Sequence, residues 1–450
     1  MKLSDIAELN PKRTLKKGTV APFVEMAALP TNAKNITEIT QKTFSGSGSK
    51  FKNGDTLFAR ITPCLENGKT ALITELNDEE IAHGSTEFIV ISPKNISVDM
   101  HYIYYLARLP EFREYARSRM EGTSGRQRVS WQSLAEFEFN FPNEEKRKVI
   151  GEKLSLLDEK ITLNTQTNQT LEQIAQAIFK HWFIDFAPVH AKANALARGE
   201  TIEQAELAAM ACLSGKTAEK ITALKTQDPT TYHQLQQTAA AFPSEFVETE
   251  MGQVPRGWEV KQVKDMGKII CGKTPSKKKE EFYGNDIPFI KIPDMHNNTF
   301  IIKTTDNLSL LGANNQKNKF IEKGSICISC IATVGLVSIT SERSQTNQQI
   351  NSIVPNSEIF TEYLYLYFSQ DTMNKKLKDL ASGGSATLNL NTTAFSNITL
   401  LIPNNNLIEF FHKKVQPLFD KILSNKKESI SLSDARDELL PKLLRGEIEL

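Results

Sequence analysis

The fold is decided by residues 150–171, which read IGEKLSLLDEKITLNTQTNQTL. Apolar residues in and beyond this stretch recur alternately four and three positions apart, with two polar residues in the middle. The positions of this first seam are Ile150, Leu154, Leu157, Ile161, Asn164, Asn168, Leu171, Ala175, Ile178 and Trp182. Such spacing is the a/d pattern of a coiled coil. It predicts one long helix from residue 144 to about residue 186.

The same pattern returns 261 positions later, where residues 411–432 read FHKKVQPLFDKILSNKKESISL. Residues 102–171 align on residues 363–432 without a gap (363 − 102 = 261). Identical pairs in this register include Pro142 with Pro403, Asn143 with Asn404, Lys160 with Lys421, Ile161 with Ile422 and Asn164 with Asn425. A duplication of this extent predicts two similar lobes, which usually engage a partner with two equivalent sites. Duplex DNA is the commonest such partner.

A second seam helix follows from the duplication. Its positions are Phe411, Val415, Leu418, Ile422, Asn425, Ser429, Leu432, Leu439 and Leu443. Pro417 is expected to kink or delay this helix, and Pro441 to kink its last turns, because proline lacks the N–H of an internal helix bond. Polar residues occupy the middle of both seams, where a buried Asn commonly fixes register. We therefore predict that the two helices pair with each other.

Changes in pattern divide the chain into five parts. The lobes contain alternating or β-branched runs broken by Asn-Gly turns, and each directly precedes a seam helix. The part between the two copies is rich in Ala, Glu and Gln, with short helices expected at 202–213 and 217–224. We assign a first lobe to residues 1–142, a first helix to 143–186, a connector to 187–252, a second lobe to 253–403 and a second helix to 404–450.

The direction of helix pairing sets where the lobes lie. Antiparallel helices would put the lobes at opposite ends, with a connector that carries the chain back across the molecule, whereas parallel helices would put them side by side. A helix of roughly 40 residues is on the order of 60 Å long. We predict an α+β fold in which two β-rich lobes are held apart by two long antiparallel coiled-coil helices, related by an internal pseudo-twofold repeat.

Composition limits the class of protein. The chain of 450 residues is 40% hydrophobic and 24% charged, and no run approaches the ~18 apolar residues of a membrane helix. The first residues lack the apolar core of a secretory signal, and five irregularly spaced cysteines do not form a disulfide framework. We expect a cytoplasmic protein with no membrane contact. Net charge is only +1, yet residues 1–70 carry eleven Lys/Arg against six acids, which favours local phosphate contacts.

Two motifs suggest chemistry that their surroundings do not support. Residues 267–274 match the phosphate-loop pattern G-x-x-x-x-G-K-[ST], but Ile269 and Ile270 read as strand and Pro275 disfavours the helix that must follow. Cys327 and Cys330 lie three apart in another strand-like run, so they face opposite sides and read as buried thiols. No catalytic residue and no metal site is predicted.

Polar, glycine-rich loops are better candidates for a functional site than these two motifs, and we predict that they bind DNA. Residues 122–128 and 383–389 occupy the same register before the two seam helices, and they offer backbone N–H groups, hydroxyls and long side chains to phosphates and base edges. A basic run near the start of the second lobe is a further candidate. The predicted DNA-binding residues are Lys50, Arg60, Thr123, Ser124, Arg126, Gln127, Arg128, Lys273, Thr274, Ser276, Lys277, Lys278, Lys279, Gly384, Ser385, Thr387 and Asn389.

The first seam helix resembles a known family. Residues 156–164 read LLDEKITLN and continue through NQTLE (168–172), AQAIFK (175–180) and WFIDF (182–186). This closely resembles the central conserved helix of the DNA-specificity (S) subunits of Type I restriction-modification systems. Residues 435–448 (ARDELLPKLLRGEI) look like their distal conserved helix. GKTPS at 272–276, introduced by PRGWE at 255–259, is similar to the opening of a target-recognition domain; the first lobe lacks that Gly-Trp-Glu lead-in.

The resemblance implies two target-recognition domains that read the halves of a bipartite, asymmetric site in double-stranded DNA. It also implies two methyltransferase (M) subunits on the helices and restriction/translocase (R) subunits in the full complex, with S-adenosylmethionine and ATP bound by those partners and no cofactor in this chain. Two other hypotheses stay open at this point. One is a nucleotide-dependent enzyme using Gly267 to Thr274, and the other is a protein-bridging scaffold that does not bind DNA.

Overall fold

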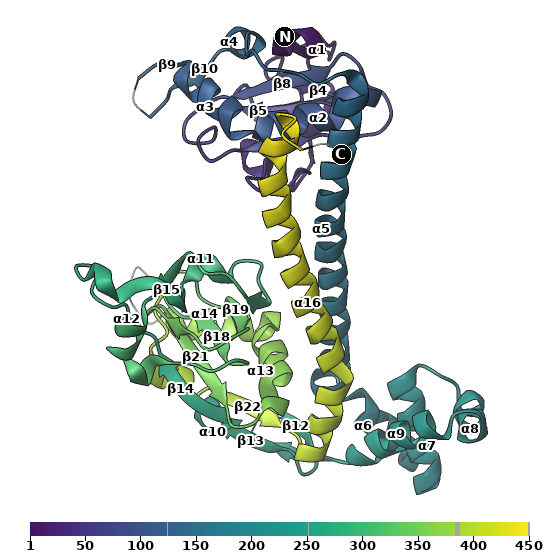
Figure 1. Ribbon diagram of the computed structural model, residues 1–450. Helices are drawn as coiled ribbons and strands as arrows, with labels where there is room; N and C mark the ends of the chain where they lie inside the picture. Colours follow the sequence, from purple (N-terminus) through teal and green to yellow (C-terminus); the bar gives the residue numbers. More distant parts are fainter. Residues whose placement is uncertain (124, 251, 383–387, 449–450) are drawn as a thin grey trace. The chain divides into compact units, whose positions relative to one another are not determined.

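The computed structural model describes residues 1–123, 125–250, 252–382 and 388–448. They form two compact units. Unit 1 consists of Met1–Asn164 and Glu428–Leu450, and unit 2 of Thr165–Lys427. The long helices α5 (Glu144–Phe179) and α16 (Asn405–Leu444) each contribute a segment to both units (Figure 1).

Two small sheets form the β-rich part of unit 1, with strand orders β1-β8-β5-β6 and β3-β2-β7-β4. Alternate side chains of the central strands enter two cores, as a pleated strand requires: Phe58 and Ile89 pack in one, and Leu57 and Val90 in the other. The bounds are β1 Ala7–Leu9, β2 Val20–Val24, β3 Thr40–Thr43, β4 Ser49–Phe51, β5 Thr56–Ala59, β6 Thr70–Leu72, β7 Ala82–Gly84 and β8 Phe88–Pro93.

Short helices cover the first of these cores. The aromatic run at residues 102–105 of α2 is buried there, because helix α2 lies against strands β5, β6 and β8. The helices are α1 Leu3–Ile6, α2 Ile96–Arg108, α3 Pro110–Ser118 and α4 Trp131–Ala135.

Unit 2 repeats this plan with strand orders β14-β21-β18-β19-β16 and β17-β15-β20. Two further pairs, β11-β12 and β13-β22, lie outside these sheets. The strands are β11 Phe246–Thr249, β12 Gly252–Pro255, β13 Glu259–Gln262, β14 Gly267–Cys271, β15 Tyr283–Ile290, β16 Phe300–Ile301, β17 Asp306–Leu308, β18 Ile326–Ser329, β19 Val337–Thr340, β20 Gln345–Thr346, β21 Ile350–Pro355 and β22 Thr399–Ile402. The short helices are α10 Val263–Met266, α11 Ile292–Met295, α12 Leu310–Asn314, α13 Thr361–Phe368, α14 Asp371–Ala381 and α15 Thr392–Ser396.

The two units confirm the predicted duplication. Helices α3, α4 and α5 start at residues 110, 131 and 144, and α14, α15 and α16 start at residues 371, 392 and 405, each 261 positions later. Strand order β1-β8-β5-β6 corresponds to β14-β21-β18-β19. Strand β2 pairs antiparallel with β3 and parallel with β7, just as β15 pairs antiparallel with β17 and parallel with β20.

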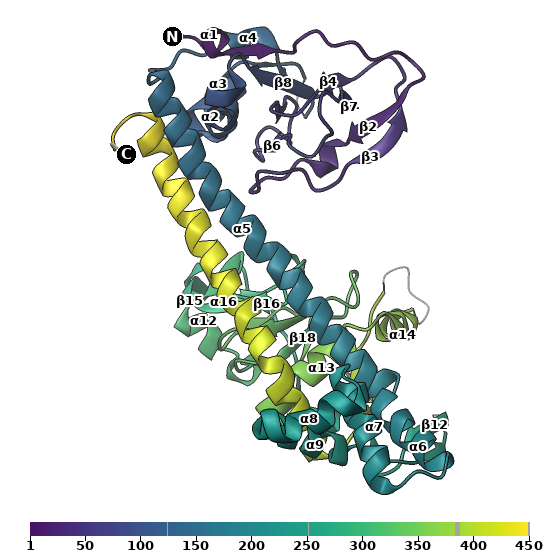
Figure 2. The same cartoon turned by 90° about the vertical axis from the view of Figure 1, so that its right-hand side faces the viewer.

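Helices α5 and α16 lie side by side and run antiparallel in each unit (Figure 1 and Figure 2). In unit 2, Asn425 Nδ2 donates to Asn168 Oδ1 at 2.9 Å, and further along the ring of Phe179 contacts that of Phe411. In unit 1, Asn164 Nδ2 donates to Glu428 Oε2 at 2.8 Å and to Ser429 Oγ at 3.3 Å. No described seam position is fully exposed. The predicted pairing through a polar layer is therefore confirmed.

The register of these polar contacts follows from the duplication. Adding 261 to 164 and subtracting 261 from 429 converts the Asn164–Ser429 pair into the Asn168–Asn425 pair, and both pairs are hydrogen-bonded. Self-complementary contacts of this kind are typical of an isologous, twofold interface. Pro417 does not delay helix α16, which starts at Asn405 and continues through both prolines to Leu444.

The connector differs from its prediction in one respect. A π-helical turn (Lys180–Ile184) follows α5, and four helices form a small bundle in unit 2. They are α6 Ala187–Ala197, α7 Ile202–Ser214, α8 Ala218–Gln227 and α9 Pro229–Ala241, which confirms the expected helices at 202–213 and 217–224. However, the connector does not carry the chain back across the molecule. Its end lies next to its start, since Trp182 packs on Phe242 and Lys192 Nζ donates to Phe242 O at 2.8 Å.

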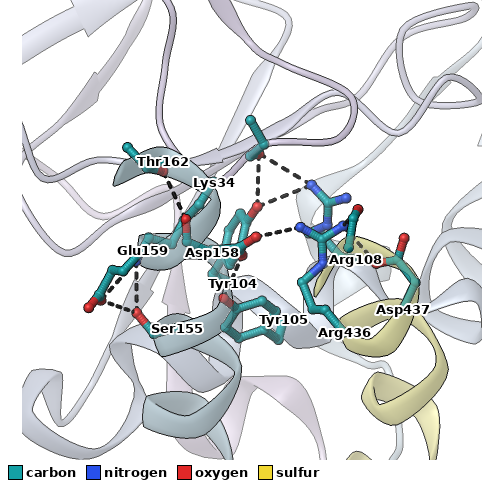
Figure 3. Close-up of polar contacts among 12 residues, drawn as sticks. Lys34, Tyr104, Tyr105, Arg108, Ser155, Asp158, Glu159, Thr162, Arg436 and Asp437 are labelled. Carbon is teal, nitrogen blue, oxygen red and sulfur yellow. Dashed lines mark hydrogen bonds and ion pairs between the residues drawn. The ribbon is translucent and has the colours of Figure 1, made fainter. Parts of the chain in front are cut away.

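A buried polar cluster joins the first lobe to the helix pair within unit 1 (Figure 3). Asp158 of α5 and Arg436 of α16 form an ion pair whose side chains are only 3% and 1% exposed. Tyr105 of α2 donates its hydroxyl to Asp158 Oδ2 at 2.6 Å. Burial lowers the pKa of Arg436, but the ion pairs with Asp158 and Asp437 together outweigh it, so the net shift is upward and the guanidinium stays charged.

A second set of bonds surrounds this cluster. Lys34 Nζ donates to Ser155 Oγ at 2.7 Å and to Glu159 Oε1 at 3.3 Å, and Tyr104 donates its hydroxyl to the carbonyl of Ala33 at 2.9 Å (Figure 3). These contacts tie an N-terminal loop and helix α2 to helix α5. They orient the first lobe on the segment of the helix pair that belongs to its own unit.

Candidate nucleic-acid interface

The loop predicted at residues 122–128 is the tip of a β-hairpin in unit 1. Strand β9 (Met120–Glu121) pairs antiparallel with β10 (Arg128–Val129). Gly122 and Gly125 have φ values of 124° and 83°, a region that favours glycine. Thr123 and Arg126 are exposed, Gln127 and Arg128 are half-buried, and Ser124 lies outside the described residues. The tip therefore presents polar side chains to solvent.

Backbone bonds fix the base of this hairpin to the chain that follows strand β5. Ile61 and Arg128 form an antiparallel bridge, and Val129 N donates to Arg60 O at 3.0 Å. Thr62 N donates to Gln127 O at 3.1 Å, and Gln127 N donates to Thr62 Oγ1 at 3.2 Å. The hairpin thus has a rigid base, while its tip carries Arg126.

Arg128 has a structural partner. Its Nε donates to the two carboxylate oxygens of Glu87 at 3.0 and 2.9 Å, and its Nη2 donates to Oε1 at 2.8 Å. Hydrogen bonding to Glu87 raises the pKa of Arg128. A guanidinium engaged in this way cannot make the same two-pronged contact to guanine. Of the two predicted arginines in the hairpin, Arg126 is therefore better placed to reach a base.

An open cavity of about 400 Å³ lies next to the base of the hairpin. Four of its lining residues are cationic, Lys12, Arg13, Lys50 and Arg60, and none of its lining residues is acidic. We call this cavity the basic groove. Lys50 and Arg60 were predicted as DNA-binding residues. Lys12 and Arg13 were not, although both belong to the basic excess of residues 1–70.

The charges of the basic groove are only partly neutralised. Arg13 forms an ion pair with buried Asp55, with Nη2 2.9 Å from Oδ1. Lys50 Nζ donates to the carbonyl of Arg13 at 3.0 Å, a contact that removes no charge. The Nε atom of Arg60 is buried without a hydrogen-bond partner among the described residues. Lys12, Lys50 and Arg60 therefore leave a positive field in the groove.

Unit 2 repeats one of these backbone bridges. Ile331, which follows strand β18, forms an antiparallel bridge with Asn389, just as Ile61 does with Arg128. The loop partners are again 261 positions apart (389 − 128 = 261). Asn389 is exposed, whereas the predicted residues Gly384, Ser385 and Thr387 lie outside the described residues. The duplicated units thus place Arg128 and Asn389 at equivalent positions, with different side chains.

The basic run of unit 2 forms an exposed turn after strand β14. Lys273 is exposed and its N–H donates to Thr346 O at 2.9 Å, and Thr274 Oγ1 donates to Gln348 Oε1 at 2.5 Å. Lys279 Nζ lies 4.9 Å from the ring centroid of Phe282. Ser276, Lys277 and Lys278 are exposed as well. This turn can offer several cations to a phosphate backbone.

The apparent phosphate loop is a strand, as its apolar residues predicted. Residues Gly267–Cys271 form β14, which pairs antiparallel with β21. A Cβ on Gly272 would lie 2.1 Å from the carbonyl oxygen of Asn347, so this glycine packs on backbone and leaves no room there for a phosphate. Only a short 3-10 turn, Glu280–Phe282, comes next. The nucleotide-dependent hypothesis receives no support.

The two cysteines spaced three apart are buried thiols, as predicted. Cys327 lies in strand β18 and Cys330 directly after it. Burial raises the pKa of Cys327 to about 12 and that of Cys330 to about 11. Both are therefore protonated and unreactive at neutral pH.

Among the residues that the structure describes, no helix is both long and apolar enough to cross a bilayer.

Comparison with known proteins agrees with this architecture. The family model of the Type I restriction modification DNA specificity domain matches residues 1–173 and 255–431. The HindI specificity subunit of a Type I restriction enzyme from Haemophilus influenzae is 51% identical over 414 residues, which cover 90% of this chain and 89% of the relative. The MjaIX specificity subunit of Methanocaldococcus jannaschii is 32% identical over 204 residues, 45% of each chain.

A solved structure shares the fold. The S subunit of a Type-I restriction-modification system from M. genitalium superposes with a TM-score of 0.52 at 15% identity, covering 99% of this chain and 95% of the other. The two matched segments of the family model coincide with the two copies of the duplication. The chain therefore belongs to the family of DNA-specificity subunits of Type I restriction-modification systems, the non-catalytic components of those complexes.

Proposed function

We propose that the two units read the two halves of a bipartite, asymmetric target in double-stranded DNA. Residues 1–142 and 253–403 would be the target-recognition domains. The observation that carries this proposal is a pair of equivalent bridges, Arg128 with Ile61 in unit 1 and Asn389 with Ile331 in unit 2. Equivalent positions with unlike side chains, such as Gln127 and Leu388, favour two different half-sites, because base readout depends on side-chain chemistry.

Local charge supports contact with the DNA backbone. The basic groove in unit 1 and the lysine turn at residues 273–279 in unit 2 offer cations to phosphates. Neutralised phosphates release counterions, which supplies much of the affinity of a DNA-binding protein and makes it salt-dependent. Unit 1 thus combines a polar hairpin that can reach bases with cations that can hold the backbone, and unit 2 offers the cations of its lysine turn.

The individual partner subunits are part of the same proposal. We expect two methyltransferase subunits to dock on the helices and restriction subunits to join the full complex, with S-adenosylmethionine and ATP bound by those subunits. Helix α5 offers a suitable surface within unit 1. Leu156 and Leu163, two helical turns apart, are 58% and 55% exposed. Because residues seven apart share one helix face, both leucines could be buried together by a docked subunit.

Co-expression with the neighbouring methyltransferase gene tests the proposal. We expect a stable complex that methylates one split sequence, with a gap of unread bases, and that shifts duplex DNA less as salt rises. The same methyltransferase without this chain should methylate no such sequence. Methylation of one continuous motif, or a complex that leaves DNA unbound at low salt, would contradict the proposal.

A further inference from the structure

We propose that the basic groove seats one phosphate of the DNA backbone, and that Arg60 and Lys12 are its anchoring cations. We further infer that this anchor is present in the first unit and missing at the equivalent position of the second. This rests on the proposed function, since the phosphate would belong to the DNA half-site that the first unit reads. It goes further by assigning different tasks to the groove and to the hairpin.

The electrostatics of the groove favour an anion. A charged N–H that is buried without a partner is costly, and Arg60 Nε is such a group. Lys12 and Lys50 line the same groove, and Asp55 is occupied by Arg13. An anion in the groove would neutralise the charges of Lys12 and Lys50 and stabilise the buried charge of the Arg60 guanidinium.

The shape of the site favours the DNA backbone over a base edge. Base edges lie inside the grooves of the duplex and are reached by protruding protein elements, as the tip of the hairpin can do. The phosphate ridge is convex and fits a concave site. Gly48 lines this groove with φ of 121°, and a Cβ there would lie 2.5 Å from the carbonyl oxygen of Gly84. A glycine at position 48 therefore lets this wall of the groove pack closely on the backbone of strand β7.

The second unit has no arginine at the matching place. Arg60 directly precedes Ile61, which bridges to residue 128, and Cys330 directly precedes Ile331, which bridges to residue 389. Cys330 is 2% exposed, and its sulfur receives a hydrogen bond from Asn351 at 3.3 Å. At this position unit 2 thus has a buried neutral thiol. The duplicated units are expected to hold their half-sites with different numbers of phosphate contacts.

The first test measures salt dependence with the full chain in complex with its methyltransferase subunits. Arg60→Gln keeps the length of the side chain and removes its charge. We expect the slope of log K against log salt to fall by about one, for target and non-target duplexes alike. Between about 50 mM and about 200 mM salt, the affinity ratio of wild type to variant should then shrink about 3.5-fold.

One further variant removes a second charge from the groove, and another removes a charge outside the groove as a control. Lys12 is exposed, so Lys12→Gln should lower the slope without any effect on folding. Arg117→Gln removes an arginine whose side chain is 72% exposed, in the same unit but not in the groove, and should leave the slope unchanged. A change of the preferred sequence in Arg60→Gln, with unaltered binding to other duplexes, would show base reading and overturn the proposal. An unchanged slope in both groove variants would overturn it as well.

The second test locates the phosphate. Single phosphates of the half-site are replaced one at a time by neutral methylphosphonates. We expect one position to weaken wild type but not Arg60→Gln, and that position to lie in the half-site whose specificity the unit 1 hairpin controls. If wild type and variant are equally sensitive at every position, the groove does not hold the backbone.

A final comparison separates DNA from free phosphate as the ligand. If inorganic phosphate raises the thermal stability of wild type but not of Arg60→Gln, while both bind DNA equally, the groove is a free-phosphate site and the proposal is wrong. Failure of the wild-type complex to bind any duplex would instead contradict the proposed function. The two failures are therefore distinguishable.

Discussion

Replacing Arg436 by alanine should loosen the first lobe on its helices. The substitution removes the charged partner of Asp158, whose side chain is 3% exposed, and leaves this carboxylate with the hydroxyl of Tyr105 as its remaining hydrogen-bond donor in the cluster described above. Breaking a buried ion pair by removing one member costs about 3–5 kcal/mol, because the other charge stays buried without compensation. We expect unit 1 to lose about that much stability.

The second unit shows which apolar residues can replace this ion pair. Under the shift of 261, its counterparts of Asp158, Arg436 and Tyr105 are Phe419, Ala175 and Leu366, and all three are buried. The combined variant Asp158→Phe, Arg436→Ala and Tyr105→Leu copies this apolar arrangement. Exchanging a buried ion pair for packed apolar side chains is often neutral or stabilising. We therefore expect the triple variant to recover most of what the single variant loses.

Hydrogen exchange of the full chain is the suitable assay, because a molecule with two units need not unfold as one. A loss of 3 kcal/mol corresponds to exchange more than about 100-fold faster for amides of helix α2 that open with unit 1, whereas helix α13 of unit 2 should be unaffected. Lys160→Ala removes a half-exposed pair with Glu428 and should cost less than about 1 kcal/mol. If the amides of helix α2 exchange at the wild-type rate in Arg436→Ala, or as fast in the triple variant as in the single variant, the reasoning is refuted.

Three further changes have defined outcomes. Matched insertion of one heptad into α5 and α16 lengthens the paired helices by about 10 Å. The unread gap of the methylated sequence should then grow by about three base pairs, which methylation mapping would show. An unchanged gap would contradict the idea that helix length sets the spacing of the two half-sites. The hydrogen bond with Glu362 raises the pKa of His412 above its ordinary 6.5, so this contribution to folding is present below that pH and lost as pH rises through the raised value. Urea unfolding across this window should show a flatter pH dependence in His412→Gln, and an equally steep one would exclude this source. Lys273→Ala should leave nucleotide titrations identical to those of wild type, since β14 forms no phosphate loop; specific ATP binding lost in the variant would contradict this.

Periodicity made the helices and the duplication predictable from the sequence. The a/d spacing and the polar interruptions at Asn164 and Asn425 depend on local order along the chain, and within residues 102–171 a constant shift of 261 transfers a local prediction from one copy to the other. The false phosphate loop could also be rejected, because Ile269 and Ile270 indicated a strand. These features need no knowledge of contacts between distant residues.

The groove and the ion pairs depend on such contacts and were not predictable. Lys12, Lys50 and Arg60 come from three separate segments that only the pairing of strands brings together. Arg128 appeared free in the sequence because Glu87, its partner, lies 41 positions earlier. The expected return path of the connector was wrong because a lobe that precedes its antiparallel helix needs no such crossing. Which loop residues contact DNA stays a prediction.

One measurement tests the central claim most directly: the sequence methylated by the complex, compared between wild type and Arg126→Ala. Two equivalent units that read separate half-sites predict a split motif in which the variant relaxes one half, by about 1–3 kcal/mol for a lost two-pronged base contact, and leaves the other half intact. Equal relaxation of both halves, or a motif that does not depend on this chain, would contradict the account.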